Sequence, residues 1–146
     1  MKNVLNLIVL FTATLSLSCQ GQSGFVKIDE SEIDTVKLKS VQKLATDILL
    51  AQKRGTYYQL TSEQATAAMV EGLSETVQKS SHIQLKQLFG AFKEIKFHSL
   101  MENEQRFRVY RFKVVYESDA DVEVRAVTDS AGKLAGFFIK PWNDSL

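Results

Sequence analysis

The sequence is poor in the residues that build covalent or metal-bound frameworks. Among its 146 residues it has one cysteine, Cys19, one proline, Pro141, and two histidines, His82 and His98. A single cysteine excludes an intramolecular disulfide. Two histidines far apart in the sequence, with no cysteine near them, fall short of a transition-metal site. We therefore expect neither a metal nor another cofactor.

The chain also lacks an excess of charge of either sign. Its 18 lysines and arginines stand against 17 aspartates and glutamates. Binding to nucleic acid phosphates draws on a concentrated excess of basic side chains. The balance therefore argues against a nucleic acid as partner. Loss of residues 1–18 would remove Lys2 and bring the formal balance to zero.

No apolar run is long enough to cross a bilayer. The run at 4–11 is shorter than the roughly 20 residues that a spanning helix needs. It follows Lys2 and leads into a small-residue stretch at 15–18, directly before Cys19. A basic residue, a short apolar run and a small-residue junction are typical of a bacterial export signal. We expect residues 1–18 to be a signal peptide.

Cys19 stands where bacterial lipoprotein precursors carry the cysteine that is lipidated after cleavage. This position predicts a lipoprotein of the bacterial cell envelope, held at the membrane by an N-terminal lipid on the periplasmic or cell-surface face. Ser16 occupies a position where this junction usually has leucine. Because Ser16 and Ser18 also suit ordinary signal peptidase, release of a soluble exported protein that begins at Cys19 is the alternative.

The rest of the chain divides into a tether, one domain and a short tail. Residues 19–39 contain the attachment cysteine and a tether, whose first part is polar and has two glycines. Two alternatives stay open for residues 25–39, which either dock on the domain or begin the first helix early. The domain covers 40–142, and residues 143–146 form a C-terminal tail.

Apolar residues at helical spacing predict three helices in the first half of the domain. The first runs from Ser40 to Gly55, the second from a capping box at Thr61 to about Val77, and the third from Ser81 to Gly90. Gly72, on the apolar stripe of the second helix, suggests a close helix crossing.

Beyond Gly90 the apolar period changes to two, which predicts strands. They cover 94–101, 108–116, 122–128 and 134–140, with short turns between them. Short connections favour an antiparallel meander. The fold class is therefore α+β, with N-terminal helices wrapped by a curved four-stranded antiparallel sheet.

Three segments carry a resemblance to a known family. They are 88–95, the paired strands through Tyr116 and Val122, and 129–141, whose sequence is DSAGKLAGFFIKP. Together they resemble the bacterial domain-of-unknown-function family 3887, which is similar in fold to nuclear transport factor 2. The resemblance covers about 40–142 and implies a cone-shaped, cystatin-like α+β domain. It implies no catalytic residues.

The aromatic residues of the domain are the set most typical of a pocket. They would line an apolar cavity with hydroxyl groups at its mouth, or simply fill the core between helices and sheet, which large aromatic side chains usually do. The set is Tyr57, Tyr58, Tyr110, Phe112, Tyr116, Phe138 and Trp142.

The opposite face of the strands mixes aliphatic and complementary charged side chains. Such a face forms either the contact of a homodimer or an ordinary solvated surface. Its predicted residues are Val109, Arg111, Lys113, Val115, Glu123 and Arg125.

Signals for catalysis or calcium binding are weak. A histidine acting with a carboxylate would need His82 or His98, and neither has a recognisable partner in the sequence. Glu117, Asp119 and Asp121 alternate like calcium ligands, but the glycine and the distal glutamate of such a loop are missing, which favours a solvated turn.

The sequence therefore favours a non-catalytic module that binds a small apolar ligand, a peptide or an envelope protein. The alternatives are a small hydrolase or isomerase that uses one of the histidines, and a purely structural dimeric lipoprotein.

Overall fold

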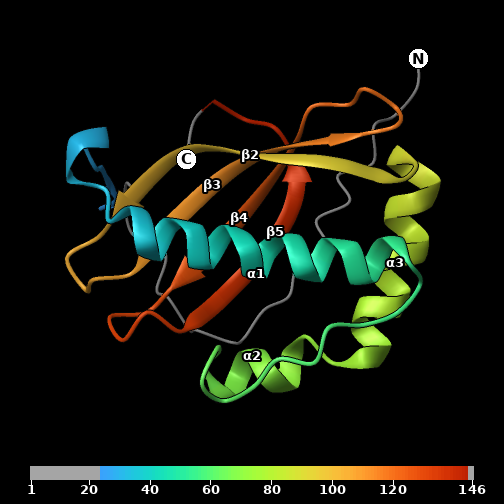
Figure 1. The fold of residues 1–146 in the computed structure, drawn as a ribbon, viewed down its shortest axis with the longest axis horizontal. Helices are drawn as coiled ribbons and strands as arrows, with labels where there is room; N and C mark the ends of the chain where they lie inside the picture. Colours follow the sequence, from blue (N-terminus) through green and yellow to red (C-terminus); the bar gives the residue numbers. More distant parts are fainter. Residues whose placement is uncertain (1–23, 145–146) are drawn as a thin grey trace.

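The computed structural model describes residues 24–144, which form an α+β fold (Figure 1). A five-stranded antiparallel sheet, in which the strands lie in sequence order, is combined with three α-helices in this part of the chain. The elements are β1 (Val26–Lys27), a 3-10 turn (Glu30–Glu32), α1 (Thr35–Lys53), α2 (Ala67–Gly72), α3 (Glu75–Phe89), β2 (Phe92–Glu102), β3 (Arg108–Tyr116), β4 (Val122–Thr128) and β5 (Leu134–Pro141). The predicted α+β class is confirmed.

The prediction of four strands is wrong because β1 adds a fifth. Val26 pairs with Glu102, and the Ile28 amide donates to the Leu100 carbonyl at 2.9 Å. A strand of two residues is too short for an alternating pattern to reveal it. Residues 25–28 thus dock on the sheet.

The first helix also begins earlier than Ser40. Asp34 lies at its N-cap, and its carboxylate accepts hydrogen bonds from the amides of Val36 and Lys37. These bonds satisfy donors that a helix leaves open at its first turn. Both alternatives for residues 25–39 are therefore realised, each in a different part of the segment.

The two following helices are divided differently from the prediction. Gln64 accepts from the Thr61 amide at 3.2 Å, as a capping box requires, but α2 begins only at Ala67, after the cap Thr66. Ser81, the predicted start of the third helix, lies buried inside α3 and donates to the Val77 carbonyl. The predicted crossing at Gly72 is wrong, because this residue is exposed and no atom lies within 4 Å of a Cβ built there.

Helix α1 lies across one face of the sheet (Figure 1). The core between them joins Ala45, Ile48 and Leu49 of α1 to Phe112, Val124 and Phe137 of the strands, all fully or almost fully buried. We call the side of the sheet that packs on α1 the inner face and the opposite side the outer face.

A β-bulge at His98 changes which residues of β2 point toward each face of the sheet. Phe97 pairs with Phe112 and Ser99 with Arg111, so His98 is an additional residue in β2. The strict alternation assumed from the sequence would put Ser99 on the same face as Ile95. Because a bulge shifts the alternation by one residue, Leu100 packs in the core instead, and Ser99 lies on the outer face opposite Arg111.

A buried glutamine ties the segment between α1 and α2 to α3. Gln78 is fully buried, and its side-chain amide accepts from the Tyr58 amide at 2.8 Å. The same amide donates to the carbonyls of Tyr58 and Leu73, at 2.8 and 2.7 Å. One side chain thus satisfies three backbone groups on both sides of α2.

We predict that Gln78→Leu lowers the free energy of unfolding by about 3 kcal/mol or more, because it leaves three backbone groups without their partner. Chemical denaturation monitored by circular dichroism measures this change. Gln87→Leu, at an exposed position of the same helix, is the matched control and should leave stability nearly unchanged. Equal effects of the two substitutions would contradict the role assigned to Gln78.

Candidate functional site

A cleft of about 380 Å³ opens between α1, the segment before α2 and the turn that joins β4 to β5. Val41, Leu44 and Leu134 supply apolar walls, while polar groups come from Ser40, Lys43, Asp47, Tyr58, Glu63 and Gln64. Ligand sites in proteins combine apolar walls with a few placed polar groups and have volumes of about 300 to 1,000 Å³. The cleft meets this description.

The walls of the cleft are held in place by hydrogen bonds. The Tyr58 hydroxyl accepts from Gln64 Nε2 at 2.8 Å, and the Tyr58 backbone is held by Gln78. The backbone of Gln64 in turn accepts from the Leu134 amide at 2.9 Å. The segment before α2 is therefore joined to the start of β5, which fixes two sides of the cleft.

The charged groups at the cleft include an ion pair on α1. Lys43 Nζ lies 2.6 Å from Asp47 Oδ2, one helical turn away. The hydrogen bond to Asp47 raises the pKa of Lys43. The cleft therefore has an ammonium group, which donates hydrogen bonds, next to a carboxylate, which accepts them.

The structure does not bring the seven predicted aromatic residues together. Tyr110, Phe112 and Tyr116 are buried on the inner face, in agreement with the alternative that the aromatic residues fill the core. Phe138, opposite Arg125, lies on the outer face, where Trp142 also packs, and Tyr57 is exposed. Among these seven, Tyr58 lines the cleft.

The contribution of α1 to the cleft was not predicted from the sequence. The residues in question are Val41 and Leu44, at the border of the apolar stripe of the helix, and the polar residues beside them, Ser40, Lys43 and Asp47. The available signal was the mixture of polar and aliphatic residues at this border. A search for aromatic side chains does not detect it.

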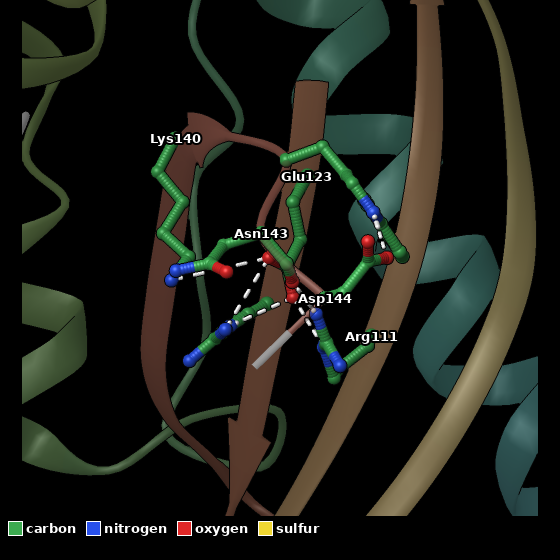
Figure 2. A network of polar contacts seen from close by, with 7 residues as sticks. Arg111, Glu123, Lys140, Asn143 and Asp144 are labelled. Atoms are coloured by element: carbon green, nitrogen blue, oxygen red, sulfur yellow. Dashed lines mark hydrogen bonds and ion pairs between the residues drawn. The ribbon is translucent and has the colours of Figure 1, made fainter. Parts of the chain in front are cut away.

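The outer face carries a buried carboxylate surrounded by cations (Figure 2). Glu123 has no exposed surface, and its Oε1 lies 2.5 Å from Arg111 Nε and 2.7 Å from Arg125 Nε. Lys140 Nζ lies 3.9 Å from the other carboxylate oxygen. Arg111 also donates to the backbone carbonyl of Asn143, so the C-terminal segment is bound to this cluster.

Trp142 covers part of the same face. Its ring lies 5.0 Å from the Arg111 guanidinium carbon and 4.4 Å from Lys113 Nζ, both within the range of cation–π interactions. The His98 ring packs edge-on against it, with centroids 4.6 Å apart. The indole nitrogen donates to Asp144 at 2.8 Å.

The six residues predicted as a dimer surface do share the outer face. Arg111 pairs with Arg125, and Lys113 with Glu123, across β3 and β4. However, Arg111 and Glu123 are already buried within the chain, as is Val109. Lys113 is exposed on this face, and Val115 is half-buried.

The protonation of Glu123 is set by two opposing effects. Burial alone would raise the pKa of its carboxyl group, but the hydrogen bonds from Arg111 and Arg125 outweigh burial and lower the pKa below its ordinary value. Burial, together with nearby Arg125, lowers the pKa of Lys140. The cluster is therefore built around an ionised glutamate.

We predict that Glu123→Gln costs about 3 to 5 kcal/mol of unfolding free energy, because it leaves buried guanidinium groups without their counter-charge. Since the folded-state pKa lies below the ordinary value of 4.5, the stabilisation by Glu123 is present above that pH and is lost as the pH falls through the folded-state pKa. Urea denaturation at several pH values should show a weaker loss on acidification for Glu123→Gln than for wild type. Glu94→Gln, in an exposed pair with Lys96, is the control; an unchanged acid response in Glu123→Gln would contradict the prediction.

The two histidines lie in different places, and no carboxylate of the described residues comes within ion-pair distance of either. His82 lines a small hollow beside α1, and His98 packs on Trp142. Burial lowers the pKa of both, with a further contribution from Lys86 at His82 and from Arg111 at His98. Within residues 24–144 neither imidazole thus has the carboxylate that would orient it as a general base.

The three acidic residues at 117–121 form the turn between β3 and β4. Glu117 accepts from the Ala91 amide at 2.9 Å, and Asp119 has a backbone φ of 55°. Among the residues that the structure describes, no three histidine, cysteine or acidic side chains are grouped as metal ligands would be. Glu117 instead ties the start of β2 to the end of β3.

Comparisons with known proteins do not identify a family. No family model, no curated protein and no solved structure matches the chain. The resemblance to family 3887 therefore stays a prediction. The expected signal peptide and Cys19 lie outside the described residues. None of the helices within residues 24–144 has the length and apolar content needed to span a membrane.

Proposed function

We propose that this protein is an exported, lipid-anchored module of the bacterial cell envelope that binds a small molecule without transforming it. The observation that carries the proposal is the cleft beside α1, with its aliphatic walls and fixed polar groups. The anchor would be Cys19, and the domain would have the cone shape of the nuclear transport factor 2 fold.

The walls indicate the chemistry of the ligand. An apolar part would pack against Val41, Leu44 and Leu134, while a polar group would meet Tyr58 or the Lys43–Asp47 pair. Because both kinds of wall are present, we propose a small amphiphilic ligand rather than a purely apolar one. The hydrogen bonds that hold Tyr58 would reduce the entropy lost on binding.

The alternatives have less support. An enzyme that uses His82 or His98 lacks an oriented acid–base pair within residues 24–144. A dimer formed through the outer face would have to use a surface whose central residues, Arg111 and Glu123, are already buried by the chain itself.

We predict that Ser40→Trp blocks the cleft, because Ser40 lines it from α1 and is exposed. The probe is the amphiphilic dye anilinonaphthalene sulfonate, whose fluorescence rises in apolar surroundings. Titration should show binding to wild type that is weakened by about tenfold or more in Ser40→Trp. Lys39→Trp adds the same side chain at the neighbouring exposed position of α1, away from the cleft, and should bind the dye like wild type. Equal binding by all three proteins would contradict this site.

We predict that Cys19→Ser moves the protein from the membrane to the soluble fraction, because the substitution removes the thiol that would carry the lipid. Fractionation of the producing cells, with intact-mass measurement of the wild-type chain, tests this. An unmodified wild-type chain in the soluble fraction would refute the anchor and leave the cleft proposal intact.

A further inference from the structure

The cleft beside α1 carries polar groups that a ligand can reach. In Lys43, 76 % of the side chain is exposed, and in Asp47 30 %. Glu63 is exposed and Tyr58 is half-buried. All four side chains line the cleft, so their chemistry decides which ligand it accepts. The choice of ligand made below rests on the function proposed above.

The hydroxyl group of Tyr58 has a proton to donate. Gln64 Oε1 accepts from the Thr61 amide and hydroxyl, at 3.2 and 3.3 Å. Because a backbone amide only donates, Gln64 must turn its oxygen to Thr61 and its nitrogen to Tyr58. Gln64 Nε2 therefore donates to the Tyr58 hydroxyl oxygen at 2.8 Å. Within the described residues no hydrogen bond uses the hydroxyl proton itself, which is left for an oxygen atom of a ligand.

Two charges of opposite sign lie side by side at the same cleft. Lys43 Nζ and Asp47 Oδ2 are 2.6 Å apart. The hydrogen bond to Asp47 is the main cause of the raised pKa of Lys43, and Tyr58 adds to it because its oxygen lies near the ammonium group. An acceptor group of a ligand would thus find an ammonium and a hydroxyl proton close together.

A ligand with a charge of one sign alone fits these groups poorly. An anion drawn to Lys43 would also meet the carboxylates of Asp47 and Glu63, and Glu63 has no cation within 4 Å among the described residues. A cation drawn to these carboxylates would meet Lys43. Since like charges repel at such short range, a ligand that carries both charges is favoured. In an α-amino acid the ammonium and carboxylate groups are attached to one carbon atom, so they lie as close together as the Lys43–Asp47 pair.

The walls next to this pair select an apolar side chain. Val41 and Leu44 lie one turn apart on α1 and are half-buried, so part of their surface remains open to a ligand. Covering apolar surface of this kind favours binding.

We propose that the cleft binds a free α-amino acid with a large aliphatic side chain, such as leucine. The ligand carboxylate would accept from the Tyr58 hydroxyl and face Lys43. The ligand ammonium would face Asp47 and Glu63, and the aliphatic side chain would pack against Val41 and Leu44.

The test is isothermal titration calorimetry of the full-length protein in mild detergent, with L-leucine as the probe. We expect saturable binding. Three analogues each lack one recognised group: leucinamide the carboxylate, N-acetylleucine the ammonium and alanine most of the side chain. Each should bind about tenfold more weakly or worse.

Variants of the ion pair assign the two charges of the ligand. Asp47→Asn should weaken leucine by about tenfold but not N-acetylleucine, which has no ammonium group. Lys43→Gln should weaken leucine but not leucinamide, which has no carboxylate. Glu75→Gln and Lys79→Gln change a similar pair on α3, outside the cleft, and should bind leucine like wild type.

A third variant tests the hydroxyl proton. Tyr58→Phe removes the hydroxyl group alone and should weaken leucine while thermal unfolding shows a folded protein. Tyr57→Phe makes the same change at the preceding exposed position, which does not line the cleft, and should bind leucine like wild type.

The proposal is overturned if leucine shows no saturable binding or if leucinamide or N-acetylleucine binds as tightly as leucine. It is also overturned if Lys43→Gln or Asp47→Asn retains wild-type affinity for leucine. Because these two side chains reach the solvent, the result remains decisive even if Tyr58→Phe does not fold. Dye binding that Ser40→Trp blocks, without any leucine binding, refutes the amino acid ligand alone. Dye binding that Ser40→Trp leaves unchanged refutes the cleft itself.

Discussion

The buried amide of Gln78 is the interaction on which the cleft beside α1 and the connection to α3 depend. It holds the backbone of Tyr58, whose ring lines the cleft beside α1. It also donates to the Leu73 carbonyl, immediately before α3. One side chain of α3 thus joins the segment before α2 to the residue that follows it.

The two faces of the sheet differ in how they use polar groups. On the outer face the cations around Glu123 are matched by a buried carboxylate, the Asn143 carbonyl and the Trp142 ring, so the charge is largely satisfied within the chain. On the inner side, the cleft beside α1 has polar groups on its walls, and the buried side-chain amide of Gln52 has no hydrogen-bond partner among the described residues. The cleft proposed as the ligand site therefore lies on the α1 side of the sheet.

The sequence predicted β3, β4 and β5 almost to the residue, because period-two alternation and short turns are local properties. It missed β1, whose partner Glu102 is far away in the chain, and the bulge at His98, which leaves no mark in composition. The polar residues Gln78 and Ser81 obscured the true start of α3, because they are buried. Gln52 and Gln78 look alike in sequence, and only the tertiary contacts decide that one is satisfied and the other is not.

The order of the strands leaves β1 and β5 at the two edges of an open sheet, where unpaired backbone groups can recruit a strand from another copy. β1 is only two residues long, and the uncovered part of β2 carries Lys93 and Glu94 together with the bulge at His98. At the other edge, Ala65 bridges the start of β5 and Pro141 closes its end. Continuous sheets running through neighbouring molecules are thereby disfavoured, which would keep a densely crowded population of this protein from aggregating.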